Sequence, residues 1–476
     1  METVARVLDP HPVASLEDYT ANDGGRGLDL ARATPDEVIA RVEDSGLRGR
    51  GGAGFPTGRK WRTVAAMASD VVPTTVVVNG AEGEPGTFKD RAILRRNPYR
   101  VIEGALIAAA AVGADRVIIA VKQSFRREIE RVRGALAEVS AAGWRRHVEL
   151  EVVPGPDEYL FGEETGLLEV LAGRPPFPRV SPPFRHGADE LGEGGVSAAD
   201  VEMAAPTDDA AAPPTLVNNV ETFANIPRIV ADGPDWFREV GTPESPGTIV
   251  CTITGSTRRH GVGEVPLGTP LRDIIRQLGD GPEYGHTISA VLPGAAHPLI
   301  PEPLLDTPAA YEDLAAVGSG LGAGGFIVFD DTDDPVAIAH GVARFLAVES
   351  CGQCRPCKLD GLDIADRLGR LEQGRGTELD VTEIASRVRD VTVGARCYLA
   401  HQQQRIIESV LAFYPDELRA RAGASDAVDP VLIAPIVNLE GGQAQLAEGH
   451  AGKQPDWTYG ATWSGKSPAD GMARVP

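Results

Sequence analysis

Four cysteines in the C-terminal half of the chain constrain its fold more than any other feature. Cys351, Cys354 and Cys357 are each separated by two residues, and Cys397 follows 40 residues after the last of them. Two-residue gaps let one tight turn or helix start present three sulfur ligands, and a 4Fe-4S cluster needs four. The spacing therefore predicts a 4Fe-4S cluster, with Cys397 as the fourth ligand.

The spacing alone leaves two alternatives open. Four cysteines also bind zinc, although zinc sites usually pair two C-x2-C halves, and this chain has one triplet and one singlet. Plain buried thiols are the other alternative. Disulfides are not expected because nothing else in the sequence indicates secretion. The fifth cysteine, Cys251, is expected in the middle of a strand as a core thiol.

The bulk composition is that of a globular protein with roughly three domains at 476 residues. Sixty-eight acidic residues against 46 basic ones give a net charge of -22, which argues against nucleic-acid binding. The N-terminus has no apolar core of a signal peptide, and the apolar run from Ala105 to Ala114 is too short to cross a membrane. We therefore expect a cytoplasmic protein.

A glycine-rich loop covers residues 47 to 62, after a helix predicted from the capping-box pattern at residues 34 to 37. Gly49, Gly51 and Gly54 match G-x-G-x-x-G, but a helix rather than a strand precedes them, so a Rossmann turn is not expected. The loop contains five bases and no acid, namely Arg48, Arg50, Arg59, Lys60 and Arg62. Glycines allow close backbone approach and bases supply charge, which favours a phosphate or pyrophosphate site over a solvated basic loop.

Strands and helices then alternate, which predicts a parallel sheet in a three-layer α/β fold. The expected elements are strand 76–78, helix 98–112, strand 116–121, helix 125–142 and strand 148–153. Asn79, Glu82 and Glu84 follow the first strand. Ligands in open α/β sheets lie outside the carboxyl ends of strands, so these residues are pocket candidates, with turn formation as the alternative.

Two later motifs have both a functional and a structural interpretation. Glu163 and Glu164 open a predicted helix, where carboxylates also compensate the helix dipole. Asn218 and Asn219 could bind the edge of a ring or cap the next helix. Residues 185–214 lack periodicity and predict a long surface loop.

The remaining chain divides into a small β-rich unit, a helical unit and a tail. In the β-rich unit we expect strand 248–254, a turn region at 261–266, helix 271–278 and strands around 290 and 327. The predicted domains are 1–246, 247–332, 333–421 and 422–476. The last of these is expected to be extended and to lie along a partner.

Taken together, these residues resemble the family of NADH-binding FMN/4Fe-4S flavoprotein subunits of respiratory complex I and the diaphorase subunits of NAD-linked hydrogenases and formate dehydrogenases. The resemblance covers about residues 15 to 418 and depends on motifs at 49–58, 82–86, 162–165, 218–222 and 349–357. It implies a Rossmann-like FMN/NADH-binding domain, a β-grasp domain of the soluble-ligand-binding, ubiquitin-like type, and a C-terminal helical bundle that carries the 4Fe-4S cluster.

The resemblance also implies a set of contacts. The glycine loop would hold FMN and the dinucleotide through Gly49, Arg50, Gly51, Gly52, Gly54 and Lys60, and Phe55 would stack on the nucleotide. Further flavin contacts would be Asn79, Glu82, Gly162, Glu163, Asn218, Asn219 and Thr222. The NADH side would be lined by Glu84, Tyr159, Glu164 and Phe184. Glu84 and Glu164 are the catalytic candidates, which would orient the dihydronicotinamide and disfavour extra negative charge.

The implied function is that of an NADH dehydrogenase component in which FMN takes hydride from NADH and the 4Fe-4S cluster passes single electrons on. The implied partners are a thioredoxin-like 2Fe-2S subunit and a larger multi-cluster iron-sulfur subunit, in a soluble assembly or the peripheral arm of a membrane complex. Ala81, Ser181 and Thr63 depart from the family pattern. They motivate two alternatives: an electron-relay protein that no longer uses NADH, and a scaffold with a structural cluster.

Overall fold

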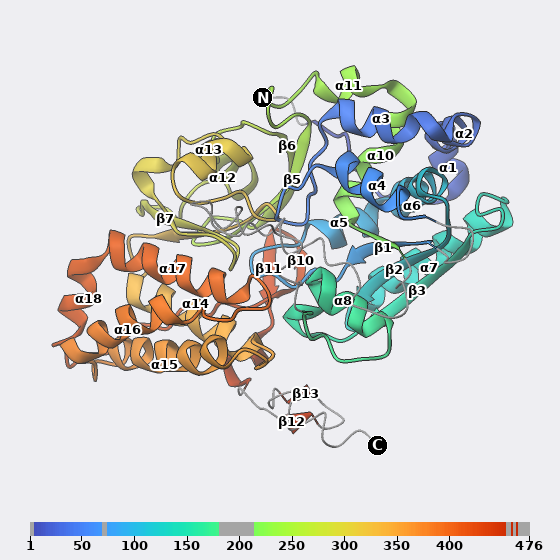
Figure 1. Cartoon of the computed structure of the whole chain (residues 1–476). Helices are drawn as coiled ribbons and strands as arrows, with labels where there is room; N and C mark the ends of the chain where they lie inside the picture. The colour runs from blue at the N-terminus through green and yellow to red at the C-terminus, as the bar shows by residue number, and fades with distance from the viewer. Residues whose placement is uncertain (1–3, 69–73, 180–213, 454–457, 460–462, 465–476) are drawn as a thin grey trace.

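The computed structural model of the chain describes residues 4–68, 74–179, 214–453, 458–459 and 463–464. It has three parts, which Figure 1 shows as an α/β part in blue to green, a β-rich part in yellow and a helical part in orange. The mixed α/β architecture and the parallel sheet confirm the predicted fold class at this level.

A four-stranded parallel sheet forms the centre of the first part, with the strand order β3-β2-β1-β4. Its strands are β1 (Thr74–Gly80), β2 (Ala114–Lys122), β3 (Glu149–Gly155) and β4 (Thr215–Asn219). Val77 lies level with Ile118 on one side and with Val217 on the other. The β-branched residues of these strands explain why they form a buried sheet, since such side chains pack well on a pleated surface.

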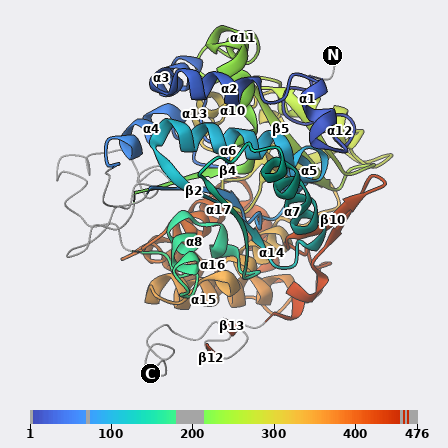
Figure 2. The same cartoon turned by 90° about the vertical axis from the view of Figure 1, so that its right-hand side faces the viewer.

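Helices cover both faces of this sheet, as Figure 2 shows from the side. Val76 and Val78 belong to the larger core, which the long helices α6 (Pro98–Val112) and α10 (Val220–Asp232) fill, whereas Val77 belongs to a smaller core with Phe161 and Leu167. The helical elements of this part are α1 (Leu16–Ala21), α2 (Arg26–Ala33), α3 (Pro35–Ser45), α4 (Thr57–Ala65), α5 (Lys89–Arg96), α6 (Pro98–Val112), α7 (Arg126–Ala141), the 3-10 helix η1 (Tyr159–Gly162), α8 (Glu164–Leu171), α10 (Val220–Asp232) and α11 (Pro234–Arg238). The predicted three layers are therefore present.

The helix before the glycine loop, α3, ends at Gly46 as its sequence suggests, but the capping box predicted at its start does not form. The hydroxyl of Thr34 donates back to the carbonyl of Leu30 at 3.3 Å instead of capping α3. The reason is that α2 ends directly at Thr34, so its last carbonyls compete for this hydroxyl.

The β-rich part is a five-stranded mixed sheet with the order β6-β5-β9-β7-β8. Its elements are β5 (Thr248–Gly255), β6 (Gly261–Pro266), α12 (Leu271–Gly279), β7 (Ile288–Pro293), β8 (Ile300–Pro301), the 3-10 helix η4 (Glu302–Leu304), α13 (Tyr311–Ala316) and β9 (Gly325–Asp330). The turn predicted at 261–266 was wrong, because this segment is the edge strand β6, paired antiparallel with β5. Its two glycines hid the strand, and Gly263 leaves room for Leu278 of α12.

Five helices form the third part, as predicted for residues 334–421. They are α14 (Pro335–Glu349), α15 (Arg355–Glu372), α16 (Glu378–Asp390), α17 (Leu399–Phe413) and α18 (Pro415–Arg421). Asp334 caps α14 by accepting from the backbone N–H of Val336 at 2.8 Å. The helices bury a shared apolar core that includes Ala343, Leu368 and Ile407.

The segment after α18 differs from the extended tail that we expected, because much of it folds back on the chain itself. It contains the hairpin β10 (Ile436–Glu440) and β11 (Gln443–Leu446), the 3-10 helix η5 (Glu448–Gly452), and the short strands β12 (Thr458–Tyr459) and β13 (Trp463–Ser464). The Arg91 guanidinium donates to the carbonyl of Ile436 at 2.6 Å, and the Ile436 side chain is buried in the α/β core. Figure 1 shows β10 and β11 in red between the three parts.

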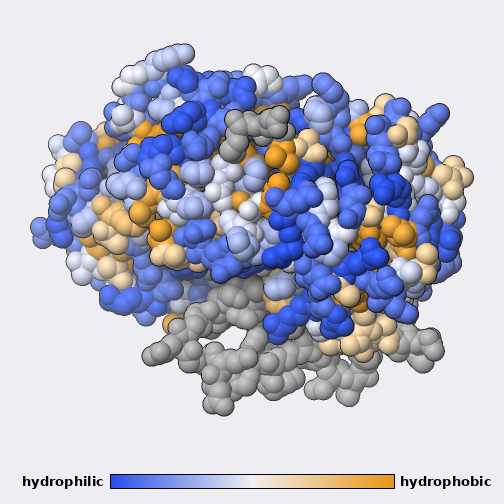
Figure 3. All heavy atoms as spheres, turned by 90° about the horizontal axis from the view of Figure 1, so that it is seen from above, coloured by the Kyte–Doolittle hydropathy of each residue, from blue (hydrophilic) through white to orange (hydrophobic). Residues whose placement is uncertain are grey.

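Hydrophilic side chains cover most of the face seen in Figure 3, and apolar residues are scattered between them. Among the described helices, none combines the length and apolar character that a membrane-spanning segment requires. The loop predicted at 185–214 lies outside the described residues, except for its last position.

Candidate functional site

The four cysteines singled out by their spacing meet around one small cavity, here called the thiol cavity. Cys351 and Cys354 line it from the segment between α14 and α15, Cys357 from the first turn of α15, and Cys397 from the approach to α17. The other lining residues are Leu160, Pro178, Ser350, Ala395, Arg396, Leu399 and Ala400. Residues 40 positions apart are thus brought together, as a four-cysteine site requires.

Local contacts hold the cysteine triplet in place. The buried ammonium of Lys358 donates to the carbonyls of Ala347 at 2.9 Å and Ser350 at 2.8 Å, which satisfies the C-terminal end of α14. The Ser350 hydroxyl lies 3.4 Å from the sulfur of Cys357. Burial raises the pKa of Cys357 to about 12, so a group that bonds to the sulfurs must supply positive charge to hold them as thiolates.

A much larger cavity of about 850 Å³, here called the large cavity, opens next to the thiol cavity. All three parts of the molecule contribute to its wall: the glycine loop and the ends of β1 and β4, the β-rich segments around His297 and Tyr311, and the start of α17. Its volume is in the range of sites that enclose a small organic ligand.

The two cavities share part of their wall. Leu160 of η1 and the pair Cys397 and Leu399 line both of them. A group in the large cavity therefore lies one side chain away from a group held by the cysteines.

Ten of the predicted cofactor-contact residues line the large cavity. They are Gly51, Gly52, Asn79, Glu82, Glu84, Tyr159, Gly162, Glu163, Glu164 and Asn219. Asn79 and Asn219 come from the carboxyl ends of the neighbouring strands β1 and β4, where the strand-end rule places ligands. The Asn79 amide also donates to the carbonyl of Gly162 at 2.8 Å, which ties η1 to the sheet.

Seven other predicted residues are not part of the described cavity wall and stand behind it or beside it: Gly49, Arg50, Gly54, Phe55, Lys60, Asn218 and Thr222. Asn218 accepts from the indole N–H of Trp61 at 2.8 Å, and Thr222 accepts from the backbone N–H of Arg50 at 2.9 Å. The eighth, Phe184, lies outside the described residues, as does Ser181.

The glycine loop is braced by Tyr311 of the β-rich part. The Tyr311 hydroxyl donates to the carbonyl of Gly49 at 2.9 Å. At Gly54, where φ is +66°, an added Cβ would lie 2.5 Å from the Tyr311 ring. Glycine is therefore required at Gly54 both by its left-handed backbone and by the approach of this ring.

Arg50 does not supply charge to the large cavity, in contrast to its predicted role. Its side chain is 1% exposed and donates to the carbonyls of Arg48 at 2.9 Å and Thr248 at 3.2 Å. Arg50 therefore connects the glycine loop to β5 of the β-rich part. Within the described structure, Arg48 is the one base of the loop that lines the cavity, and it also stacks on Tyr311 at 4.1 Å.

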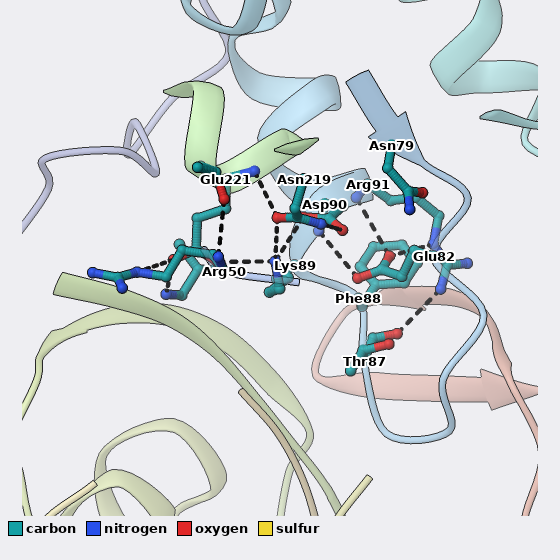
Figure 4. A network of polar contacts seen from close by, with 12 residues as sticks. Arg50, Asn79, Glu82, Thr87, Phe88, Lys89, Asp90, Arg91, Asn219 and Glu221 are labelled. Atoms are coloured by element: carbon teal, nitrogen blue, oxygen red, sulfur yellow. Dashed lines mark hydrogen bonds and ion pairs between the residues drawn. The ribbon is translucent and has the colours of Figure 1, made fainter. Parts of the chain in front are cut away.

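A buried ion-pair network lies behind the ends of β1 and β4 (Figure 4). The Lys89 ammonium is 2.8 Å from Asp90, 2.9 Å from Glu221 and 2.9 Å from the amide oxygen of Asn219. Burial alone would lower the pKa of Lys89, but Asp90 and Glu221 outweigh it and raise the pKa. Burial raises the pKa of Asp90 to about 6, against the attraction of Lys89. The network fixes Asn219 at the cavity wall.

Glu82 belongs to a second buried pair in the same figure. Its carboxylate accepts from the Arg91 guanidinium at 2.9 Å and from the backbone N–H of Asp90 at 3.1 Å. Glu82 therefore fixes the start of α5, and its side chain is committed to the protein rather than to a ligand.

Glu84 is the least compensated acid of the cavity wall. Burial raises its pKa to about 8, and its Oε1 atom accepts no hydrogen bond from any described residue. Gly294 of the β-rich part, with φ of +61°, passes so close that an added Cβ would lie 2.2 Å from this oxygen. Lys89 and the backbone N–H of Ala295 partly offset the effect of burial on this pKa, and Oε1 itself is packed against Gly294; while the carboxyl is protonated it can act as a hydrogen-bond donor.

Glu164 behaves differently from Glu84 because it has a cation beside it. The Lys60 ammonium lies 2.7 Å from its carboxylate, and both side chains are largely buried. Lys60 lies in α4, the helix that begins at Thr57 and takes up the last part of the predicted glycine loop, and Glu164 opens α8. The pair fastens the loop to the opposite wall of the cavity.

The sequence reasoning missed several wall residues, among them Lys89, His297, Gln402 and Arg405. Lys89 could have been found, since it follows the acidic loop after β1 at the same strand end. The other three come from the β-rich and helical parts, where no local pattern marks them.

The residues present fit the groups that the motifs predict. Four sulfurs around one cavity form the donor set of a 4Fe-4S cluster. The large cavity is lined by glycine backbone and by amide side chains at two strand ends, which are suited to a flavin and a dinucleotide.

Comparison with protein families agrees with both sites. Residues 42–228 match the Nuo51 FMN-binding domain. Residues 337–421 match the NADH-ubiquinone oxidoreductase-F iron-sulfur binding region. The second match includes all four cysteines of the thiol cavity and favours iron-sulfur over the zinc alternative.

The chain is also similar to known proteins over most of its length. It is 37% identical to an NADH-quinone oxidoreductase subunit of Rhizobium meliloti over 81% of this chain and 89% of that protein. It is 34% identical to the NADP-reducing hydrogenase subunit HndC of Solidesulfovibrio fructosivorans, over 87% of this chain and 81% of that one. Its fold matches the crystal structure of an NAD+-reducing [NiFe]-hydrogenase with a TM-score of 0.72 at 31% identity, covering 88% and 68% of the two chains.

Proposed function

The chain belongs to the family of FMN- and 4Fe-4S-binding NADH-quinone oxidoreductase subunits and their hydrogenase relatives, and on this premise we propose how its two cavities divide the reaction. It is an FMN- and 4Fe-4S-dependent NADH oxidoreductase subunit. We assign FMN and the nicotinamide of NADH to the large cavity, and the cluster to Cys351, Cys354, Cys357 and Cys397 in the thiol cavity.

The observation that carries this assignment is the shared wall. Leu160, Cys397 and Leu399 line both cavities, so the donor site and the cluster site are neighbours. When bound, FMN accepts a hydride from NADH and the cluster takes up electrons singly, so that a two-electron donor can serve a one-electron acceptor. The protein supplies position and the electrostatic field.

Within the large cavity the residues take different tasks. The backbone of Gly51 and Gly52 permits close approach of a phosphate-bearing ligand. The amide of Asn79 already donates to Gly162, and that of Asn219 donates to Asp90 while its oxygen caps α10, so each would give a ring edge only its second amide hydrogen. Glu84 donates a hydrogen bond while it is protonated. Glu164, held by Lys60, keeps a negative charge that attracts the oxidised, positively charged nicotinamide.

The finer fold and assembly assignments are part of this proposal. The four-stranded part would be the Rossmann-like FMN/NADH-binding domain, the five-stranded part the β-grasp domain, and the helical part the cluster-bearing bundle. The chain would pass electrons to a thioredoxin-like 2Fe-2S subunit and a larger multi-cluster subunit. Relatives named as oxidoreductase and hydrogenase subunits support such an iron-sulfur assembly.

The test is to mix the purified, cofactor-loaded protein with NADH and follow flavin bleaching, then to add ferricyanide and measure steady turnover. We expect rapid bleaching and turnover. Flavin that stays oxidised with NADH but bleaches with dithionite would contradict the proposal and favour the electron relay. Protein that contains iron but no flavin as purified, before any loading, and that takes up no added FMN would favour the scaffold.

A further inference from the structure

One buried carboxylate joins three distant segments beside the thiol cavity. Glu349, the last residue of α14, has a side chain that is 5% exposed. Its Oε2 accepts from the backbone N–H of Tyr159 at 3.1 Å, and its Oε1 accepts from His450 Nε2 at 2.9 Å and Lys453 Nζ at 2.5 Å. The two side-chain donors come from the C-terminal segment 448–453, here called the strap.

The strap is also fastened to α14 by a second set of contacts. The Arg344 guanidinium donates to the carbonyls of His450 at 3.1 Å, Ala451 at 2.7 Å and Lys453 at 2.9 Å. The Phe345 ring lies 5.0 Å from the His450 ring and 5.3 Å from the Tyr159 ring. The strap, α14 and η1 therefore form one packed unit.

Glu349 is connected both to the cysteine segment and to the wall of the large cavity. In the chain, Ser350 and the ligand Cys351 follow it directly. Through Tyr159 it holds η1, from which Tyr159 lines the large cavity and Leu160 lines both cavities. A shift of this carboxylate would therefore move the cluster loop and the shared wall relative to each other.

We propose that His450 and Lys453 of the strap are positioning residues for electron transfer from the large cavity to the cluster, acting through Glu349. Without these two donors the buried carboxylate keeps, among the described residues, only the Tyr159 N–H as a hydrogen-bond partner and the electrostatic attraction of Lys122 and Lys358, so it shifts from its present place. Tyr159 would then lose its charged acceptor, and η1 would lose its fixed distance from the cluster loop. This inference rests on the function proposed above.

The test uses the full chain with both cofactors loaded and the double variant His450→Phe/Lys453→Met. Phenylalanine keeps a ring against Phe345, and methionine keeps the length of the lysine side chain, so that the donors alone are removed. Glu448→Gln is the matched control, since Glu448 is an exposed residue of the same 3-10 helix. Lys453→Arg in an otherwise unchanged chain should preserve the ion pair.

Three quantities are measured: NADH–ferricyanide turnover, the rate at which NADH reduces the cluster as seen by rapid-freeze EPR, and hydrogen exchange of the Tyr159 amide. In the double variant we expect turnover within about twofold of the parent, cluster reduction slowed by about fivefold or more, and faster exchange of the Tyr159 amide, since fixed geometry is what the strap contributes. Glu448→Gln and Lys453→Arg should match the parent in all three.

Unchanged cluster reduction in the double variant would overturn the proposal. So would an equal fall of turnover and cluster reduction, because it would indicate a general loss of stability. If the double variant does not fold, Lys453→Met alone decides by the same criteria. If NADH reduces the cluster in neither the parent nor the variant, the proposed function has failed. The positioning role of the strap is then still tested with the dithionite-reduced protein: an unchanged Tyr159 exchange rate and an unchanged EPR line shape of the cluster in the double variant would overturn it.

Discussion

The thiol cavity and the large cavity are built on opposite plans. The thiol cavity takes three of its four sulfurs from one short segment, and the groups that would bond to a cluster are the very residues that define it. The large cavity is assembled from all three parts, and many of the residues that shape it do not line it. Arg50 and Glu221 work behind the wall, through backbone contacts and ion pairs.

This difference shows which sites leave a clear trace in a sequence. Direct ligands must be of one residue type at fixed spacing, so Cys351, Cys354, Cys357 and Cys397 stand out. A site that binds its ligand through backbone groups and amide side chains depends on other residues that hold those groups in position, and such residues can come from any part of the chain. We therefore expect the thiol cavity to fail completely when one residue changes, and the large cavity to fail by degrees.

The largest effect is expected from Cys397→Ser. With one of four ligands replaced by a weaker one, the 4Fe-4S cluster should be lost, while flavin and NADH–ferricyanide turnover remain. Iron content and the EPR signal of the reduced protein measure this. The matched control is Cys251→Ala, a cysteine buried in β5, which should keep the cluster; equal cluster loss in both variants would contradict the assignment.

A large but partial effect is expected from Lys89→Met in the ion-pair network at the wall of the large cavity. The change leaves Asp90 buried without its cation and Glu221 with only one described cation, the more distant Arg50 guanidinium at 4.0 Å, which should destabilise the fold by about 3–5 kcal/mol. The urea midpoint, followed by flavin fluorescence, should fall, while the cluster signal of the folded protein stays unchanged. Lys89→Arg keeps the charge and should lose less; an unshifted midpoint in Lys89→Met would show that the network does not support this wall.

A smaller effect is expected from Glu164→Gln, which removes the negative charge beside Lys60. The inhibition constant for NAD+ should rise by about fivefold, equivalent to about 1 kcal/mol, because the oxidised nicotinamide loses an attractive partner. The KM for NADH should change less. Unchanged inhibition by NAD+ would exclude this role for Glu164.

The smallest effect concerns Glu84 and pH. Because burial raises the pKa of Glu84 to about 8, its carboxyl is protonated below that pH and loses its hydrogen as pH rises through it. If the protonated form donates to the nicotinamide, the KM for NADH should be about twofold higher at pH 8 than at pH 6. In Glu84→Gln the amide stays a donor at both values, so a persisting pH dependence would assign it to another group.

Much of the fold was accessible from the sequence because local patterns and packing agree there. The helix predicted at 98–112 is present with the expected ends, and the strand predicted at 76–78 is present but runs from Thr74 to Gly80, since the apolar residues of both serve the same sheet. The approach of Asn79 and Asn219 was not predicted, because no strand was expected before Asn219, and it follows from the parallel pairing of β1 with β4.

The errors arose where distant contacts decide. The edge strand at 261–266 depends on its partner β5, and the tail hairpin depends on Arg91 and on burial of Ile436. Arg50 was predicted to face a phosphate because its loop is basic, but carbonyls of the β-rich part satisfy it instead. Local charge does not show in which direction a side chain will point.

The single layer of side chains between the cavities has a practical meaning for engineering. A designer who wishes to accept a bulkier electron donor would ordinarily reshape the pocket and leave the relay alone. Here Leu160 and Leu399 line both the large cavity and the thiol cavity, and Cys397 cannot be replaced because it is the proposed fourth cluster ligand. A substitution at this shared wall therefore changes both the preference for an electron donor and the rate of electron transfer to the cluster. A chimera between homologues would have to exchange η1 and the start of α17 together.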